Sequence, residues 1–309
     1  MSRYHTPVLL PECLELLDVA SGGVFLDGTL GGGGHSLAMA RAMGSEGMVI
    51  GIDRDEDALA EVSRRLKEEQ IESVHLDKRC FKDFPETLHS LQISSVSGIL
   101  LDLGVSSHQF DAGPRGFSYR MDAPLDMRMD RSSPLSAETV LSEYSQKQLG
   151  TILREYGEVR GAAKMADCIC RYRKTMPVHT TGEFVSLLEQ EYPRISPKAL
   201  SKIFQALRIE VNDELAELRQ VLEHSLHYLS PGGRIAVISY HSLEDRIVKN
   251  FIRSAEKSCH CPAHVPVCTC GGNNARMRAL TRKPVVASSE EIARNSRARS
   301  AKLRGGVRV

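Results

Sequence analysis

The sequence predicts an α/β fold with a parallel, Rossmann-like sheet that carries an inserted all-helical domain. Short apolar runs, typical of buried strands, end in an aspartate three times, at Asp27, Asp53 and Asp102. A Pro-Gly-Gly turn at 231–233 joins a helical pattern to a further apolar run at 235–240. Strands that alternate with helices favour a parallel sheet, which binds its ligands at the carboxyl ends of the strands.

The first apolar run, at 24–26, leads into a glycine-rich loop that ends in Gly33-Gly34-His35. Glycines let backbone N–H groups approach a ligand because no Cβ stands in the way. We expect Gly33, Gly34 and the backbone N–H of His35 to face a ligand at the start of a helix. The second run ends on Asp53, where doubly wound folds hold a carboxylate against ribose hydroxyls. Loop and carboxylate together predict a site for an adenosine-containing cofactor.

The loop also selects among adenosine cofactors. It has no Gly-Lys-Ser/Thr after its glycines, so a P-loop for nucleoside triphosphates is excluded. Its spacing is not G-x-G-x-x-G, and Asp27 would repel the pyrophosphate of a dinucleotide. A carboxylate at this position suits a cationic ligand, and S-adenosylmethionine carries both a sulfonium and an ammonium group. We therefore predict S-adenosylmethionine, with Asp27 among the residues that bind it.

The region before the Pro-Gly-Gly turn is too long for a single crossover helix. Apolar residues recur there with helical spacing in the segments 136–155, 162–174, 181–191 and 197–229. We expect a cofactor-binding domain at 1–107 and 201–309, and a helical insertion at 108–200 that projects over the strand ends. One helix at 201–229 should return the chain to the sheet.

Longer motifs, spread over nearly the whole chain, carry a resemblance to a known family. They are His5–Leu10, Asp27–Thr29, Gly33–Ser36, Asp53–Asp55, Leu101–Ser107, Arg115–Ser118, Pro124–Asp130, Gln205–Leu215, Ser239–Lys249 and Arg297–Ser300. Through them the chain resembles the bacterial RsmH (MraW) family, whose members methylate N(4) of a cytidine in the decoding region of 16S ribosomal RNA. The resemblance implies a class I methyltransferase sheet and a substrate-binding role for the insertion. It also implies cofactor contacts from Phe81 and Gln109.

Methylation of a cytosine amine needs hydrogen-bond acceptors, because the N(4) lone pair is conjugated into the ring. Acceptors aimed at its N–H groups would draw the nitrogen toward sp³ geometry. Asp102 lies at the right strand end for this role, with Ser106 and Ser107 close behind it, and we expect Asp102 to contact the cofactor as well. His241, which follows the strand at 235–240, would either touch the base or cap the strand.

A methionine-rich segment contains Met121, Met127 and Met129, near Phe117 and Tyr119. Such flexible side chains could form an adaptable lid over the base or fill a core. The Asp and Arg residues interleaved with them argue against a buried helix and favour the lid.

Two C-x-C pairs, Cys259 with Cys261 and Cys268 with Cys270, stand close together. Four thiolates could hold one tetrahedral zinc ion, which would be structural. A one-residue gap is less typical of zinc sites than the two-residue gap of C-x-x-C, so free or redox-active thiols are the alternative.

The charge is unevenly distributed along the chain. The whole sequence has a net charge of +1, yet residues 273–309 contain eight Arg and two Lys against two Glu, which leaves −7 on the remainder. This basic stretch is either a phosphate-binding face for RNA or a solvated tail. The candidate phosphate contacts are Arg276, Arg278, Arg282, Lys283, Arg294, Arg297 and Arg299.

No apolar run approaches the length of a membrane span, and the first ten residues do not resemble a signal peptide, so we expect a cytoplasmic protein. Its partner should be 16S ribosomal RNA or the small ribosomal subunit. Two other classes stay open: a nicotinamide oxidoreductase, and a non-catalytic RNA- or zinc-binding module. The sequence does not specify the oligomeric state.

Overall fold

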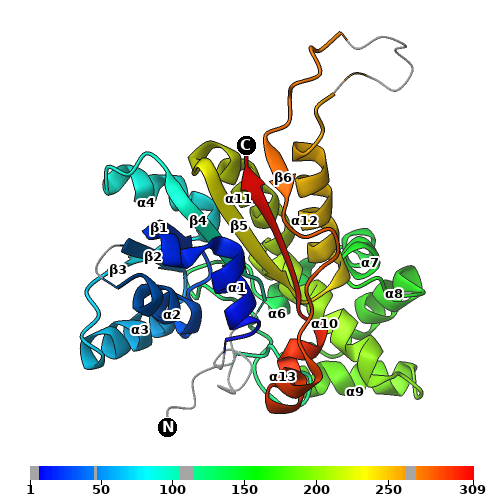
Figure 1. Cartoon of the computed structure of the whole chain (residues 1–309). Coiled ribbons are helices and arrows are strands. Elements are labelled where there is room, and N and C mark those ends of the chain that lie inside the picture. Colours follow the sequence, from blue (N-terminus) through cyan, green and yellow to red (C-terminus); the bar gives the residue numbers. More distant parts are fainter. Residues whose placement is uncertain (1–6, 45–46, 105–114, 260, 262–268) are drawn as a thin grey trace. The chain divides into compact units, whose positions relative to one another are not determined.

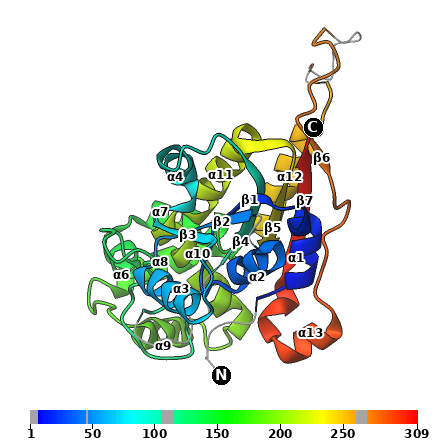
Figure 2. The same ribbon diagram turned by 60° about the vertical axis from the view of Figure 1, so that its left-hand side comes forward.

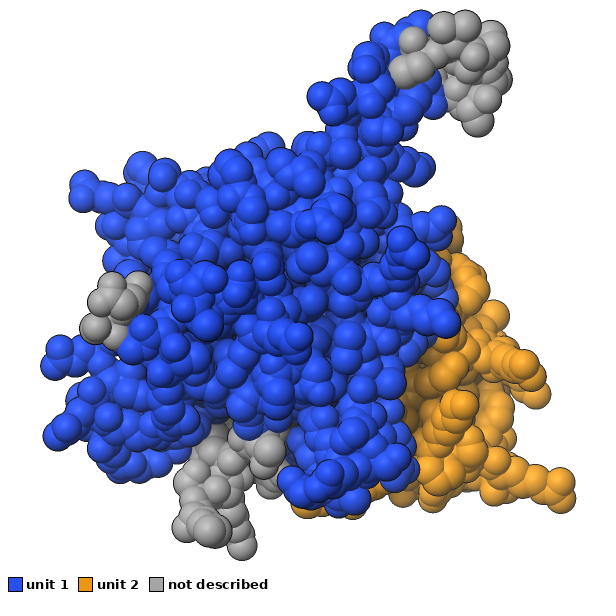
Figure 3. Space-filling model, viewed as in Figure 1, with its two compact units in different colours: residues 1–104, 216–309 blue, residues 105–215 orange. Residues whose placement is uncertain are grey.

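The computed structural model describes residues 7–44, 47–104, 115–259, 261 and 269–309. The chain divides into two compact units, one formed by 1–104 and 216–309 and the other by 105–215 (blue and orange in Figure 3). The second unit extends past residue 200, where we expected the helical insertion to end. Among the described residues, no helix is long and apolar enough to cross a membrane.

The first unit is built on a seven-stranded sheet in the order β3-β2-β1-β4-β5-β7-β6 (Figure 1). β1 to β5 run parallel, β7 pairs antiparallel with β5, and β6 pairs antiparallel with β7. This order confirms the predicted Rossmann-like α/β class. The strands are β1 (Gly23–Asp27), β2 (Gly47–Asp53), β3 (Val74–Lys78), β4 (Val96–Asp102), β5 (Leu229–Ser239), β6 (Met277–Ala279) and β7 (Lys302–Arg308).

Helices cover both faces of this sheet (Figure 2), so its central strands are apolar on both sides. In β4, Ile99 and Leu101 belong to the core under α4, α11 and α12, whereas Leu100 packs with α1 and α2 on the opposite face. The helices are α1 (Leu10–Leu17), α2 (Gly34–Met43), α3 (Glu56–Glu68), α4 (Phe84–Ser90), α11 (Glu214–Tyr228), α12 (Ser242–Ala255) and α13 (Ser289–Arg294).

The second unit has a core of its own, made by helices that the sequence pattern placed approximately. Buried residues of this core include Leu149, Ile169 and Phe184, from three different helices. The helices are α6 (Ala137–Glu143), α7 (Gln146–Glu155), α8 (Ala162–Tyr172), α9 (Thr181–Glu191) and α10 (Pro197–Asn212).

The expected return helix at 201–229 is in fact two helices. Asp213, with φ of 50°, has the left-handed conformation and ends α10, and α11 begins at Glu214. A left-handed residue interrupts the i to i−4 hydrogen-bond ladder. α10 then contributes Phe204 and Leu207 to the core of the second unit. The apolar spacing is helical on both sides of the break, so the pattern alone did not reveal it.

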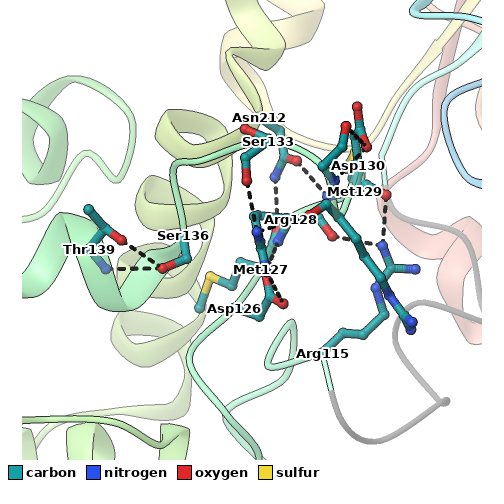
Figure 4. Close-up of polar contacts among 12 residues, drawn as sticks. Arg115, Asp126, Met127, Arg128, Met129, Asp130, Ser133, Ser136, Thr139 and Asn212 are labelled. Carbon is teal, nitrogen blue, oxygen red and sulfur yellow. Dashed lines mark hydrogen bonds and ion pairs between the residues drawn. The ribbon is translucent and has the colours of Figure 1, made fainter.

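The motif Pro124–Asp130 forms a polar turn inside the second unit (Figure 4). Buried Arg115 donates to the backbone carbonyls of Arg128 and Met129, each at 2.7 Å. Asn212 donates to the carbonyl of Met127 at 2.8 Å and accepts from the N–H of Met129 at 2.8 Å. Met127 and Met129 are buried in the helical core, so the expected lid is wrong for these two side chains. Arg115 and Asn212 satisfy backbone groups of the turn.

Candidate active site

Three aspartates end three adjacent strands of the sheet. Asp27 closes β1, Asp53 closes β2 and Asp102 closes β4, and β1 lies between the other two strands. Parallel strands bring their carboxyl ends to one edge, which is where such sheets bind ligands. The three carboxylates therefore line the edge that the sequence analysis identified.

Asp27 forms hydrogen bonds with residues of the glycine loop and of the helix that follows it. Only 1% of the residue is exposed, and its carboxylate accepts from the Ser36 hydroxyl at 2.6 Å and from the Thr29 N–H at 3.2 Å. Burial raises the pKa of Asp27. We predicted Asp27 as a direct cofactor contact. Its burial and its hydrogen bonds place it among the residues that hold the loop, and its direct contact with the cofactor stays a prediction.

Gly33 shows why the loop requires glycine. Its φ of 72° lies in the left-handed region, and a Cβ there would lie 2.8 Å from Val62 Cγ2. Gly33 caps α2, whose first residue is Gly34. At Gly34 a Cβ would meet the ring of Pro7 at 3.1 Å, which limits that position to small residues.

Asp53 ties the glycine loop to the second strand. Its Oδ2 accepts from the Gly31 N–H at 2.8 Å, and its Oδ1 accepts from the Asp55 N–H at 2.9 Å. Burial raises the pKa of Asp53, although these two hydrogen bonds oppose the rise. A carboxylate has about four lone-pair sites, so each oxygen keeps one for a further donor. Asp53 can thus accept from a pair of hydroxyl groups.

Phe81 is backed by a charged network that the sequence reasoning missed. The Arg54 guanidinium carbon lies 5.8 Å from the centre of the Phe81 ring. Arg54 donates to Glu217, which is only 5% exposed and also lies 3.6 Å from Lys82 Nζ. Arg54 directly follows Asp53 and was visible in the motif. Glu217 is distant in sequence, on α11, and no local signal pointed to it.

Asp102 is oriented by Tyr240 and lies near His35, both distant from it in sequence. The Tyr240 hydroxyl donates to Asp102 Oδ1 at 2.7 Å, and His35 Nδ1 lies 3.8 Å from Asp102 Oδ2. Burial and the nearby Asp102 charge raise the pKa of Tyr240 far above its usual value, so the phenol remains a donor. The Asp102 side chain is 16% exposed, which leaves it open to a ligand. The sequence reasoning gave Tyr240 no role, although it lies in the motif Ser239–Lys249.

His35 and His241 both have structural partners. His35 is 6% exposed, and its Nε2 lies 3.1 Å from the Val8 carbonyl, which can only accept, so Nε2 carries a proton. His241 caps α12: its Nδ1 accepts from the Glu244 N–H at 3.4 Å, and Glu244 Oε2 accepts from the His241 N–H at 3.2 Å. His241 Nε2 lies 3.0 Å from Glu244 Oε1, at an angle unsuited to a hydrogen bond. His241 therefore caps α12 and not the strand, and its contact with the base stays a prediction.

Three predicted site residues, Ser106, Ser107 and Gln109, lie outside the described residues. Their roles rest on the sequence motif alone.

The described cysteines of the C-x-C pairs cluster between α12 and β6. The sulfur atoms of Cys259, Cys261 and Cys270 lie within 4.8 Å of one another, and Cys268 is outside the described residues. The hydroxyl and N–H of Thr269 lie 3.5 Å and 3.3 Å from Cys261 Sγ and lower the pKa of that thiol. Asn274 Nδ2 lies 3.3 Å from Cys270 Sγ. Three converging sulfurs with polar donors suit a soft metal ion.

The cations of the basic C-terminal stretch fall into two groups. Arg304 is buried in β7 and donates to Asp245 at 2.6 Å, and Lys302 lies 3.4 Å from the same carboxylate. Arg304 and Lys302 thus connect β7 to α12 through Asp245. Other cations of the stretch are exposed, namely Arg276, Arg278, Arg282, Lys283, Arg294 and Arg299.

Comparison with known proteins gives a consistent result. Residues 2–307 match the model of the MraW methylase family. The chain is 45% identical over 314 residues to ribosomal RNA small subunit methyltransferase H of Finegoldia magna, covering 100% of both chains. It is 44% identical over 313 residues to the protein of the same name from Symbiobacterium thermophilum, covering 100% of this chain and 98% of the relative.

Among solved structures, an rRNA methylase from Streptococcus thermophilus is similar over 97% of this chain and 96% of its own, with 12% identity and a TM-score of 0.43. The family model matches nearly the whole chain, and relatives of about the same length are 44–45% identical to it. The chain therefore belongs to the MraW methylase family.

Proposed function

We propose that this protein transfers a methyl group from S-adenosylmethionine to N(4) of a cytidine in the decoding region of 16S ribosomal RNA. The observation that carries the proposal is the arrangement of Asp102, which is oriented by Tyr240 at the same sheet edge as Asp53 and the glycine loop. Membership of a methylase family supports the reaction type.

The residues at the edge fit S-adenosylmethionine. Asp53 has free lone pairs for the two ribose hydroxyls, and Phe81 offers an aromatic surface for the adenine. The Asp102 carboxylate at this edge favours a cationic ligand over a pyrophosphate, which argues against a nicotinamide dinucleotide. Gly33 and Gly34 would bring backbone close to the ligand, and Asp27 would keep the loop in place. When bound, the cofactor supplies a methyl group that its sulfonium already activates.

The chain's own contribution to the reaction is alignment and hydrogen bonding. Asp102 would accept a hydrogen bond from the cytosine amine, which raises the electron density on N(4). Tyr240 holds the carboxylate in one orientation, and His35 Nδ1 lies 3.8 Å from its other oxygen. The amine becomes acidic once methylated, so its proton can pass to Asp102 or to water afterwards. Ser106 and Ser107 are proposed to assist.

The target base must leave any helical stack, because a stacked amine cannot lie in line with the sulfonium. We propose that the helical insertion recognises the RNA and that the basic C-terminal stretch holds its phosphates. The protein would act in the cytoplasm on the small subunit or its RNA.

The direct test supplies methyl-labelled S-adenosylmethionine and small ribosomal particles from cells that lack this enzyme. Digestion of the RNA to nucleosides should give labelled N(4)-methylcytidine. Label in any other nucleoside would contradict the proposed target, and no transfer to RNA would contradict the activity. Cofactor absorbance of a nicotinamide on the purified protein would favour the oxidoreductase class instead.

A charge reversal tests the role of the basic stretch. Arg278, Arg282 and Lys283 are exposed, and replacing all three with glutamate should weaken binding to small-subunit RNA. The slope of log K against log salt should become shallower by about 2, at roughly 0.7 per phosphate contact on single-stranded RNA. Calorimetry should show unchanged affinity for S-adenosylmethionine. An unchanged slope would identify the stretch as a solvated tail.

We further propose that Cys259, Cys261 and Cys270, together with Cys268, bind one structural zinc ion. The purified protein should contain about one equivalent by elemental analysis, and the quadruple Cys→Ser variant should contain none. Cys170→Ser, in α8, is the matched control and should keep the metal. Metal-free protein with four titratable thiols in this cluster would contradict the site.

A further inference from the structure

A cavity of about 850 Å³ lies wholly within the second unit, apart from every residue assigned above. It is formed by the turn after α7, by α8, by the end of α9 and by the start of α10. Its volume falls in the range of roughly 300–1,000 Å³ that is typical of ligand pockets. The proposed function gives this cavity no task.

The floor of the cavity is apolar and rests on a packed core. Val159, Tyr192 and Ile195 are half-buried and pack against the helical core of the unit, and Met165 beside them is buried. Tyr192 provides an aromatic ring in this floor. The core beneath fixes these side chains, so they offer a prepared surface.

The backbone around the cavity is also fixed. Gly157 lies at the turn after α7, where a Cβ would meet the carbonyl oxygens of Leu153 at 2.8 Å and Lys202 at 2.9 Å. Gln205 of α10 donates to the carbonyl of Tyr156 at 2.9 Å. The close approach of Gly157 to the backbone of α10 and this hydrogen bond hold the turn against α10. The cavity beside this contact is therefore part of the fold.

The rim of the cavity carries an excess of positive charge. Four cations line it against two carboxylates: Arg160, Arg194, Lys198 and Lys202, with Glu158 and Glu191. Lys202 Nζ lies 3.7 Å from Glu158, whereas the other three cations form no ion pair with the described residues. An aromatic side chain and several cations that line one cavity match the two parts of a single-stranded nucleotide, a base and its phosphates.

We propose that this cavity binds an unstacked nucleotide of the RNA substrate, distinct from the target cytidine. The base lies against Tyr192, and the adjoining phosphates contact Arg194 and Lys198. This inference rests on the proposed function, because it assumes that the protein engages RNA with single-stranded segments. It identifies a particular site in the helical insertion that anchors the strand.

The first experiment uses the full-length protein and a labelled single-stranded ten-nucleotide RNA of mixed sequence, with binding followed by anisotropy. The double variant Arg194→Glu/Lys198→Glu should lose at least about tenfold in affinity, and its salt slope should fall by about 1.4 for two lost contacts. Lys147→Glu/Lys174→Glu is the matched control, since both lysines are exposed, in the same unit and outside the cavity. An equal loss in the control would overturn the proposal, as would no loss in either variant.

The second experiment tests the aromatic floor. Tyr192→Phe keeps the ring and should bind like the wild type, whereas Tyr192→Leu keeps an apolar side chain and should lose about tenfold through lost stacking. Thermal unfolding of both variants checks that the unit remains folded. Affinity that is equal in the two variants would overturn the stacking role. Equal weakening of Tyr192→Leu on single- and double-stranded RNA would show that the loss does not depend on an unstacked base and would also overturn it.

These outcomes separate the cavity from the methylation reaction. If the wild type methylates its cytidine and the cavity variants bind RNA normally, this inference fails and the proposed function stands. If the wild type transfers no methyl group to RNA but the cavity variants bind RNA more weakly than the wild type, the proposed function fails and the binding site stands.

Discussion

Replacing Asp102 with alanine should slow methyl transfer by at least ~10²-fold, the typical effect of removing one preorganised hydrogen-bonding group at a reacting centre. S-adenosylmethionine should still bind, because Asp53, Phe81 and the glycine loop are unchanged. The reason is structural: Asp102 ends β4, is 16% exposed, and is the carboxylate that Tyr240 orients at 2.7 Å. Single-turnover rates at saturating cofactor and small-subunit RNA provide the measurement.

Tyr240→Phe is the informative companion to this variant. It keeps Asp102 and the ring but removes the hydrogen bond to Oδ1. A hydrogen bond to a charged group is worth about 1.5–3 kcal/mol, so we expect a slowing of at least about tenfold, yet smaller than that of Asp102→Ala. If the rate is unchanged in Asp102→Ala, another group accepts from the amine, and Ser106 and Ser107 become the residues to test.

Replacing Asp53 with alanine should weaken S-adenosylmethionine binding by about 1.5–3 kcal/mol, or roughly 10- to 150-fold. The carboxylate would lose its bonds to the ribose, and the Gly31 and Asp55 N–H groups would lose the acceptor that positions the loop. Calorimetry on the purified chain measures the change directly. The main effect should be on affinity, so saturating cofactor should restore most of the turnover.

Asp57→Ala is the control for this prediction, because Asp57 is an exposed acid in the first turn of α3, a few residues away. Its removal should leave the affinity almost unchanged. Full affinity in Asp53→Ala would exclude Asp53 as the ribose ligand. A parallel loss in Asp57→Ala would attribute the effect to net negative charge.

The sequence alone identified the architecture and the edge of the sheet that carries the candidate site. Apolar runs that end in aspartate located β1, β2 and β4, because strands buried on both faces must be continuously apolar and their polar residues can begin only where they end. The glycine spacing indicated positions with no room for a Cβ. Gly33 is one of them, because its φ is left-handed and a Cβ there would collide with Val62. These features are local, so a single sequence contains them.

Long-range contacts were decided only by the tertiary structure. Tyr240 reaches Asp102, and Glu217 reaches Arg54, across more than a hundred residues of chain. No periodicity encodes such pairs, because each depends on which strands and helices become neighbours. The break at Asp213 has a related cause: a single left-handed residue leaves the apolar spacing intact on both sides.

The burial of individual polar side chains was likewise settled by packing. Asp27 and His241 have the residue types and positions of ligand contacts, yet Asp27 bonds to the glycine loop and His241 caps α12. A carboxylate or imidazole must satisfy its hydrogen bonds with whatever surrounds it, and the surroundings exist only once the chain has folded. Sequence thus determined which chemical groups reach the edge of the sheet, and tertiary structure determined which partners each of them contacts.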